Sequence, residues 1–193
     1  MYKRQIIKDV AKVISFGIGR KNAARVEHEL FDDTDAWRES DMDAYRQKAV
    51  GQLGTVGSGN HYVDLMRDES GFVWIGVHFG SRGLGHTSAT RYLKAAGGKD
   101  GMNVPPAVVD EDSEIGRRYI AAMQLAGRYA YAGREWVIER VRKINRRRRH
   151  RHGAQPPQLR LARDPRWPRS VGGAQGRHAG LSGPAWFRRR FDG

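Results

Sequence analysis

The sequence feature that decides the fold is a pair of glycine-rich stretches, GTVGSGNHYVD at residues 54–64 and WIGVHFGSRGLGH at residues 74–86. In each stretch a histidine stands at one end of a run that is typical of a β-strand, beside a glycine-rich turn. Glycine lets the backbone come close to an anion, and imidazole is a common metal ligand. The two stretches together therefore predict a metal or phosphate site at the ends of two strands.

The residues between the two histidines predict a β-hairpin. Strands are expected over residues 61–66 and 72–78, joined by a polar turn. A symmetrical turn would place His61 directly opposite His78, with Cβ atoms about 4.5–5.5 Å apart. That separation would allow the two imidazoles to share one metal ion. Strand alternation places Asp64 on the other face from His61.

Apolar residues at helical spacing predict four helices in the rest of the chain. They are expected over residues 1–14, 41–53, 83–96 and 113–143. Asp41 is expected to cap the second helix, and Asp112 or Ser113 the fourth. The polar and acidic residues 20–40 predict a loop with short turns, and residues 97–112 a second loop. Several helices and a single hairpin predict the α+β class.

The composition limits the class of protein. A length of 193 residues is enough for one modest domain with its own core. The sequence has no cysteine, which excludes a disulfide framework and a thiolate metal site within it. No apolar run approaches the roughly 18 residues of a membrane span, and residues 1–17 have no uninterrupted apolar signal core. We therefore expect a cytoplasmic protein without a membrane partner.

The positive charge is concentrated in the last quarter of the chain. The formal net charge is +14, of which residues 1–144 contribute only +3. Residues 145–193 contribute the other +11 and contain arginine but no lysine. We expect residues 1–144 to form the domain and residues 145–193 to form a disordered tail rich in arginine and proline. One function that follows is a non-catalytic nucleic-acid-binding protein that acts through this tail.

A second explanation of the tail is a shifted reading frame. Dominance of Arg, Pro, Gly and Ala is typical of a GC-rich gene that is translated out of frame. Codons can be chosen for residues 154–192 so that a reading one base downstream yields a peptide containing HNHHN and RKGATPAFPG. We therefore expect an out-of-frame tail that begins near residues 144–154. Resequencing the gene would decide between the two explanations.

The two glycine-rich stretches resemble the RtcB family of tRNA-splicing RNA ligases. QLGTVGSGNHYVDL at residues 52–65 is similar to the family motif GTLGSGNH. VHFGSRGLGH at residues 77–86 is similar to HSGSRGLGH, with Phe79 where the family commonly has serine or threonine. The segment YIAAMQLAGRYAYAGRE at residues 119–135 also resembles the family. The resemblance covers about residues 5–143 and implies an internal fragment of the ligase fold.

The resemblance implies an enzyme that joins RNA ends bearing a 3′-phosphate or a 2′,3′-cyclic phosphate to a 5′-hydroxyl, in tRNA splicing or RNA repair. It implies GTP and manganese as cofactors, with two Mn²⁺ in a full-length member. It implies RNA, such as tRNA halves, as the substrate and an activating helper protein as a further partner. In that family a histidine is guanylylated, GMP passes to the RNA 3′-phosphate, and the 5′-hydroxyl then displaces GMP. Histidine suits this relay because its phosphoramidate is labile.

The resemblance also implies roles for individual residues. His61 and His78 would be manganese ligands, and Arg82 would contact a phosphate of the RNA through its guanidinium fork. The residues that would face the guanine nucleotide are Asn60, His61, Tyr62, Val63 and Asp64. The family usually has glutamate at the Asp64 position, so the reach of this side chain is shortened here.

Parts of the family site have no counterpart in this sequence. The Asp-x-x-Cys motif is absent, and so is the guanylylated histidine of a Ser-His-Gly-Ala-Gly-Arg motif. The resemblance therefore implies no catalytic residue in this chain and predicts that the chain is inactive. Manganese-dependent formation of a covalent GMP adduct would contradict that prediction. A hydrolase that keeps only a metal centre is a third function class, and nothing in the sequence favours it over the ligase.

Overall fold

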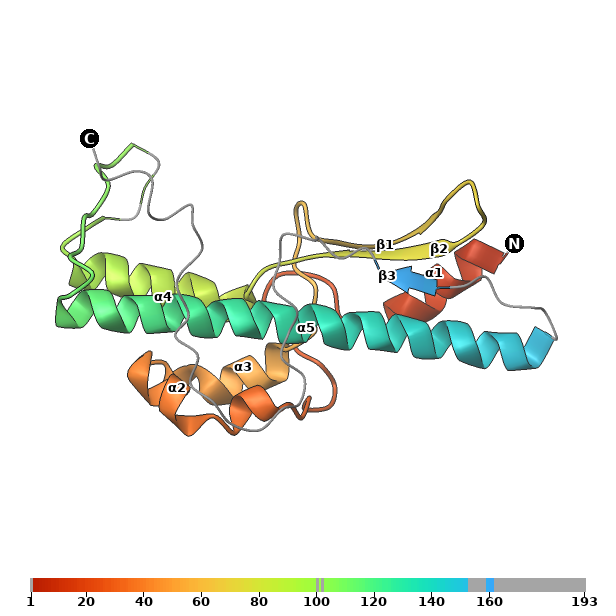
Figure 1. The fold of residues 1–193 in the computed structure, drawn as a ribbon, viewed down its shortest axis with the longest axis horizontal. Coiled ribbons are helices and arrows are strands. Elements are labelled where there is room, and N and C mark those ends of the chain that lie inside the picture. Colours follow the sequence, from red (N-terminus) through yellow and green to blue (C-terminus); the bar gives the residue numbers. More distant parts are fainter. Residues whose placement is uncertain (1, 100, 102, 153–158, 162–193) are drawn as a thin grey trace. The chain divides into compact units, whose positions relative to one another are not determined.

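Figure 1 shows the elements of the chain. The computed structural model describes residues 2–99, 101, 103–152 and 159–161. In chain order the elements are α1 (Tyr2–Val13), η1 (Glu29–Phe31), α2 (Thr34–Glu39), η2 (Asp43–Tyr45), α3 (Arg46–Gln52), β1 (Tyr62–Arg67), β2 (Val73–His78), α4 (Arg82–Ala95), α5 (Glu114–His152) and β3 (Leu159–Leu161). The elements η1 and η2 are single turns of 3₁₀ helix. Helices with one small sheet make this an α+β structure, as predicted.

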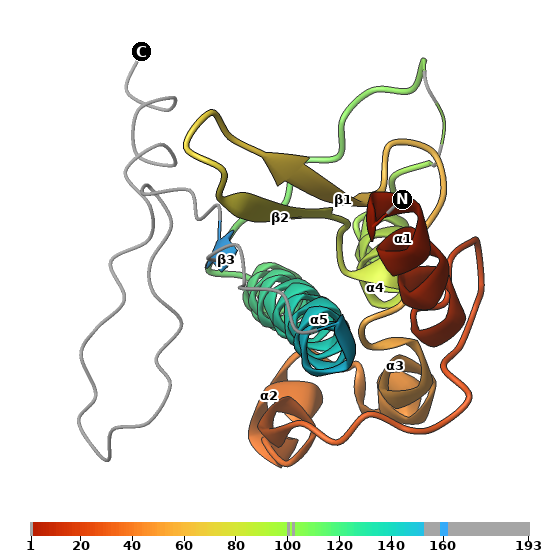
Figure 2. The same ribbon diagram turned by 90° about the vertical axis from the view of Figure 1, so that its right-hand side faces the viewer.

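The long helix α5 is the element against which the others pack. In the view along α5, the hairpin β1–β2 lies on one side of it and α2 and α3 lie on another (Figure 2). Helices α1, α2 and α4 and strand β2 all contact α5. Two clusters of buried side chains form along it, which we call the helical core and the hairpin core. No helix in the described part of the chain is both long enough and apolar enough to cross a membrane.

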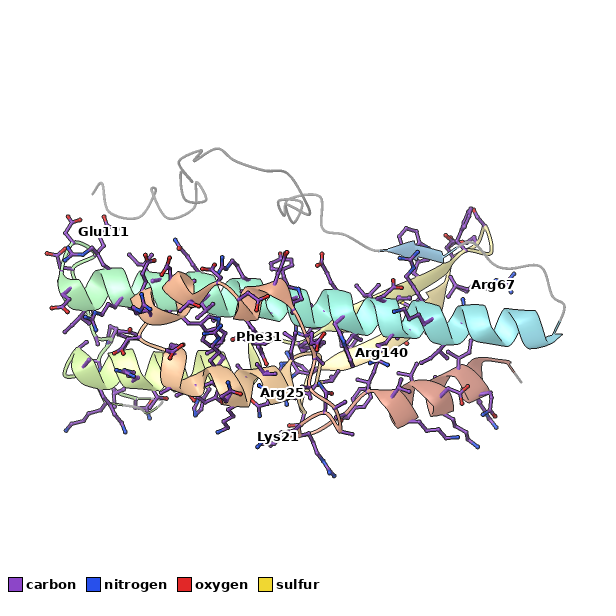
Figure 3. The ribbon with its side chains drawn as sticks, turned by 90° about the horizontal axis from the view of Figure 1, so that it is seen from below. Lys21, Arg25, Phe31, Arg67, Glu111 and Arg140 are labelled. Atoms are coloured by element: carbon purple, nitrogen blue, oxygen red, sulfur yellow. The ribbon has the colours of Figure 1, made fainter. Side chains whose placement is uncertain are left out.

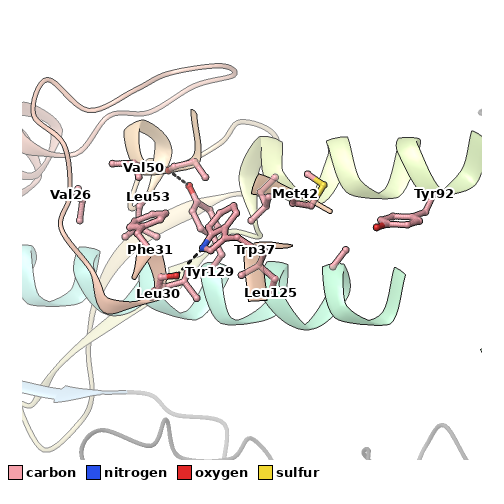
Figure 4. Packing of buried hydrophobic residues seen from close by; sticks show 14 residues of the cluster. Val26, Leu30, Phe31, Trp37, Met42, Val50, Leu53, Tyr92, Leu125 and Tyr129 are labelled. Atoms are coloured by element: carbon pink, nitrogen blue, oxygen red, sulfur yellow. Dashed lines mark hydrogen bonds between the residues drawn. The ribbon is translucent and has the colours of Figure 1, made fainter. Parts of the chain in front are cut away.

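The helical core lies between η1, α2, α3, α4 and the first half of α5 (Figure 4). Trp37 is fully buried in it, and its indole Nε1 donates a hydrogen bond to the carbonyl of Leu30 at 2.9 Å. The hydroxyl of Tyr129 donates to the carbonyl of Ala49 at 2.8 Å. The polar atoms of these two large side chains are therefore satisfied, as a stable core requires.

The hairpin core joins α1, the hairpin and the second half of α5. Its buried members are Ile6, Val10, Ile14, Val56, Ile75, Phe79, Val137 and Val141. Three of these residues come from the glycine-rich stretches themselves, one from the first and two from the second. The hairpin core therefore fixes the base of the hairpin against α1 and α5, which positions the candidate site.

The hairpin is confirmed, but its register differs by one residue from the prediction. Tyr62 pairs with His78, where the prediction was His61. The turn is the cause, because the carboxylate of Asp68 accepts a hydrogen bond from the backbone N–H of Phe72 at 2.8 Å. Gly71 completes the turn with φ +86°, a left-handed conformation that favours glycine. The strand ends are therefore offset from a symmetrical turn.

The predicted loop over residues 20–40 is wrong in its second half, which contains η1 and α2. Asp33 caps α2, since its Oδ1 accepts a hydrogen bond from the N–H of Ala36 at 3.2 Å. Elements this short hold too few apolar positions for a helical period to be recognised. The predicted helix over residues 41–53 is also divided, into η2 and α3. Asp41 does not cap it, because its φ is +51° and its carboxylate pairs with Arg91.

Helices α1, α4 and α5 begin within one residue of their predicted starts. Ser113 caps α5, as its Oγ accepts a hydrogen bond from the N–H of Gly116 at 3.0 Å. The predicted end of α5 at residue 143 is wrong, because the helix continues to His152. Arginine is a good helix former, and no glycine or proline occurs between residues 134 and 152.

The predicted tail is described only in part. Its first residues continue α5 as a helix, and β3 pairs in parallel with β2 through Leu159 and Val73. Disorder is therefore a wrong prediction for these two segments. Residues 153–158 and 162–193 lie outside the described residues. The domain boundary at residue 144 and the shifted reading frame stay predictions.

Candidate functional site

The candidate site lies where the base of the hairpin meets the first turn of α4. Two backbone segments line up there: the N–H of Val56 donates to the carbonyl of Ser15 at 2.8 Å, and the N–H of Gly17 donates to the carbonyl of Val56 at 2.9 Å. The segment after α1 and the first glycine-rich stretch are thereby held side by side. His61, His78 and Arg82 are placed around this junction.

The two predicted metal ligands, His61 and His78, do come together. Their ring centroids are 6.0 Å apart, with an angle of 58° between the ring planes. Nδ1 of His61 is buried and has no hydrogen-bond partner, and no other buried side-chain nitrogen or oxygen in the described part of the chain is in that position. Leaving such an atom unsatisfied costs roughly 1–3 kcal/mol. An orphaned nitrogen of this kind is suited to receive a ligand.

Arg82, the predicted phosphate contact, is fixed by two hydrogen bonds. Its Nε donates to Oγ1 of Thr55 at 3.0 Å, and its Nη2 donates to the carbonyl of Gly17 at 2.9 Å. Thr55 is fully buried and donates its own hydroxyl proton to the carbonyl of Gln52 at 2.7 Å, so its oxygen is left to accept from Arg82. Arg82 also has φ +54°, a conformation rare for residues other than glycine. The surrounding structure therefore holds this guanidinium in one place.

Gly57 brings the histidine and the arginine to the same point. A Cβ built on Gly57 would collide with Nδ1 of His61 and with Nη1 of Arg82. Both nitrogens therefore lie directly against the backbone of this glycine. Only glycine permits that approach, which explains why one glycine of the GxG sequence is required here.

Burial and nearby positive charge both favour the neutral form of His61. The pKa of His61 is lowered from its usual 6.5, chiefly by burial and further by the positive charges of Arg82 and His78. A neutral imidazole is the form that binds a metal ion. Burial also lowers the pKa of Arg82, but a guanidinium titrates so high that it stays positively charged at neutral pH.

The residues predicted to face the nucleotide divide between the two faces of β1. Tyr62 and Asp64 are exposed on one face, where the ring of Tyr62 stacks on His78 with centroids 5.6 Å apart. Val63 lies on the other face and packs against the hairpin core. Asn60 is exposed at the turn before the strand. A nucleotide on the outer face would therefore meet Tyr62 and Asp64 but not the side chain of Val63.

The two imidazoles can hold part of a metal coordination sphere. With a metal–nitrogen bond of about 2.1 Å, a ligating imidazole has its centroid roughly 3 Å from the ion. The observed 6.0 Å separation would therefore allow one shared ion only with the two imidazoles on nearly opposite sides of it. No cluster of three or more His, Asp or Glu side chains that could hold a metal occurs among the described residues. A divalent ion would therefore need further ligands from water or from residues beyond those described.

Sequence reasoning gave no role to three groups that hold the site together. Thr55 and the carbonyl of Gly17 anchor Arg82, as described above. Arg134 on α5 donates from Nη1 to the carbonyl of Phe79 at 2.7 Å and so fixes the turn that follows His78. The sequence carries no local signal for these contacts, because each joins residues that are distant in the chain.

Comparison with known proteins gives the family. A sequence model of the family described as tRNA-splicing ligase RtcB matches residues 3–162. The RNA-splicing ligase RtcB of Mycobacterium tuberculosis is 34% identical over 118 residues, which is 51% of this chain and 27% of that protein. The tRNA-splicing ligase RtcB of Thermococcus kodakarensis is 39% identical over 127 residues, covering 53% of this chain and 26% of that protein.

A third relative extends the similarity further along the chain. The tRNA-splicing ligase RtcB of Nanoarchaeum equitans is 30% identical over 165 residues, covering 71% of this chain and 34% of that protein. The chain thus spans between about a quarter and a third of the length of these curated relatives. The match of the family over most of the sequence, together with these relatives, shows that the chain belongs to the tRNA-splicing ligase RtcB family.

Proposed function

We propose that this chain supplies metal-binding and phosphate-binding groups of a GTP- and manganese-dependent RNA ligase, which joins 3′-phosphate or 2′,3′-cyclic phosphate ends to 5′-hydroxyl ends. One observation carries the proposal. The orphaned Nδ1 of His61 and Nη1 of Arg82 meet at Gly57, and the ring of His78 lies 6.0 Å from that of His61. Family membership and the names of the relatives support RNA joining as the reaction.

The histidine pair would hold manganese. His61 and His78 would each contribute one imidazole nitrogen, which is compatible with Mn²⁺ when harder oxygen ligands complete the sphere. When bound, the ion would act as a Lewis acid on phosphoryl oxygens. The lowered pKa of His61 keeps its nitrogen available at neutral pH without competition from a proton.

Arg82 would position the phosphate of the RNA end. Two of its nitrogens are occupied by Thr55 and Gly17, so the guanidinium cannot swing away. Its Nη1 lies beside His61 and would place an anionic oxygen next to the imidazole pair. A guanidinium held by protein contacts loses less conformational entropy when it binds than a free side chain would.

The guanine nucleotide would lie against the residues that begin β1. The stacked rings of Tyr62 and His78 offer an exposed aromatic surface to a base. Asp64 is exposed on the same face, and its carboxylate could accept a hydrogen bond from a base amino group. The aromatic surface of Tyr62 and His78 and the phosphate-binding Arg82 would then both lie at the base of the hairpin.

Titration with Mn²⁺ tests the proposal. The free ion gives a six-line electron paramagnetic resonance signal, which disappears as the ion binds to the full 193-residue chain. We expect His61→Ala and His78→Ala each to weaken binding roughly tenfold or more, since removing even a supporting group of a metal ligand costs about 10–100-fold. His86→Ala, which removes an exposed histidine of α4, is the matched control. Equal Mn²⁺ binding by all three variants would overturn the proposal.

A further inference from the structure

Opposite charges gather on different parts of the described chain. Arg91 pairs with Asp41 and Arg128 pairs with Asp33, so these two acidic residues beside α2 are neutralised by cations of α4 and α5. Helix α1 differs, because its exposed cations form no ion pair with another described residue. The helix therefore carries a net positive charge, with four cations against one acidic residue, Asp9.

The cations of α1 form a regular stripe. Ile6, Val10 and Ile14 are buried in the hairpin core, whereas the cations on the opposite side of the helix are exposed. We call these cations, Arg4, Lys8 and Lys12, the α1 basic stripe. They follow one another four residues apart, which places them about 6 Å apart along one face. At that spacing each cation can reach a separate anionic group.

The stripe leads towards the candidate site. Beyond α1, the chain continues into the segment that pairs with Val56, and the carbonyl of Gly17 in this segment accepts the hydrogen bond from Arg82. The side chain of Arg20 lies against Gly17, since a Cβ built on that glycine would be 3.4 Å from Cγ of Arg20. Figure 3 shows nitrogen-tipped side chains on α1 that extend away from α5, with Lys21 extending to the same side. The segment that follows α1 thus connects the stripe to the carbonyl that holds Arg82.

We propose that the α1 basic stripe binds successive backbone phosphates of the RNA strand whose end lies at Arg82. This inference rests on the proposed function, since it takes the occupant of the site to be an RNA end. A single phosphate would engage only one of the three cations, so the length of the stripe favours a polynucleotide. The contacts are to phosphates and carry no base specificity. The stripe would therefore hold the strand in line with the site whatever its sequence.

Binding of a short single-stranded RNA to the full chain tests the inference. Fluorescence anisotropy of labelled RNA gives the affinity between about 50 and 200 mM salt, the range over which phosphate contacts show their effect. The test variant is Arg4→Gln/Lys8→Gln/Lys12→Gln. The control is Lys94→Gln/Lys99→Gln/Arg117→Gln, which removes the same charge from exposed positions. Circular dichroism checks that both variants keep their helices.

We expect the stripe variant to bind RNA roughly 10- to 100-fold more weakly at about 0.1 M salt. The slope of log K against log salt should become shallower by about 2, because each neutralised phosphate of a single strand contributes roughly 0.7. The control variant should change much less. Equal losses in the two variants, or no loss in the stripe variant, would overturn the inference. The inference would also be overturned if the stripe variant no longer bound phosphatidylserine vesicles but still bound RNA as the unmodified chain does.

Comparing RNA that ends in a 3′-phosphate with RNA that ends in a 3′-hydroxyl distinguishes this inference from the proposed function. The stripe variant should weaken binding of 3′-phosphate and 3′-hydroxyl RNA by the same factor. Arg82→Gln should weaken binding of the 3′-phosphate RNA alone. A stripe effect without any preference for the 3′-phosphate would overturn the phosphate role of Arg82 and leave the stripe supported.

Discussion

The helical core and the candidate site differ in whether their buried polar groups have hydrogen-bond partners. In the helical core, the indole of Trp37 and the hydroxyl of Tyr129 each have a hydrogen-bond partner within the protein. At the site, Nδ1 of His61 is buried without one, and Arg82 has a left-handed backbone. Each such feature costs on the order of 1–3 kcal/mol. The difference indicates that the first region stabilises the fold, whereas the second keeps groups that a ligand would satisfy.

Removing the centre of the helical core should have the largest effect on stability. Trp37→Ala should lower the free energy of unfolding by about 3–5 kcal/mol, because it leaves a large cavity and an unpaired carbonyl at Leu30. Urea denaturation followed by circular dichroism measures the loss. Trp74→Ala is the control, since this second tryptophan is only half-buried on the hairpin. A larger loss in the control would show that the hairpin, rather than the helical core, stabilises the chain.

Filling the space at Gly57 should damage the site more than the fold. The added methyl of Gly57→Ala collides with His61 and Arg82, so one or both must move. We expect Mn²⁺ affinity to fall roughly tenfold or more and the free energy of unfolding to fall by about 1–3 kcal/mol. Gly80→Ala is the matched control, because a Cβ there meets nothing within 4 Å. Wild-type Mn²⁺ affinity in Gly57→Ala would show that the two nitrogens need not meet at this glycine.

Lowering the pH should reduce the free energy of unfolding through His61, by less than the substitutions above. Its pKa is lowered in the folded chain, chiefly by burial. As pH falls through the usual value of 6.5, the unfolded chain therefore takes up a proton before the folded chain does. The contribution of His61 to the free energy of unfolding should thus be largest above pH 6.5 and decrease as pH falls towards the lowered pKa. Urea denaturation at a series of pH values measures the decrease. His61→Gln should remove part of it, whereas His86→Gln should not.

Most of the secondary structure was predictable from local patterns. The hairpin, α1, α4 and the Ser113 cap of α5 each depend on residues close together in the sequence. The register of the hairpin was not predictable, because the hydrogen bonds that Asp68 forms with Phe72, Gly71 and Trp74 across the turn decide it. The two short elements at residues 29–39 were also missed, since the burial of Trp37 that holds them depends on packing against α5.

The residues of the candidate site could be named from the sequence, whereas the contacts that hold them could not. The glycine-rich stretches single out His61 and His78, and the resemblance to the family adds Arg82, while their metal-binding and phosphate-binding roles stay predictions. The contacts that fix them are long-range: Arg82 and Gly17 are 65 residues apart in the chain. Such pairings follow from the packing of α1 against α5, which no local pattern contains. This is why Thr55 and the carbonyl of Gly17 emerge only from the structure.

The most direct test of the account is whether His61 and His78 share one ion. Bound Mn²⁺ broadens the nuclear magnetic resonance signals of nearby protons, so the histidine ring protons of the full chain report its position. At substoichiometric Mn²⁺, the signals of His61 and His78 should broaden together while those of His28 and His86 stay sharp. Broadening of the control histidines without the pair, or of only one member of the pair, would contradict the account.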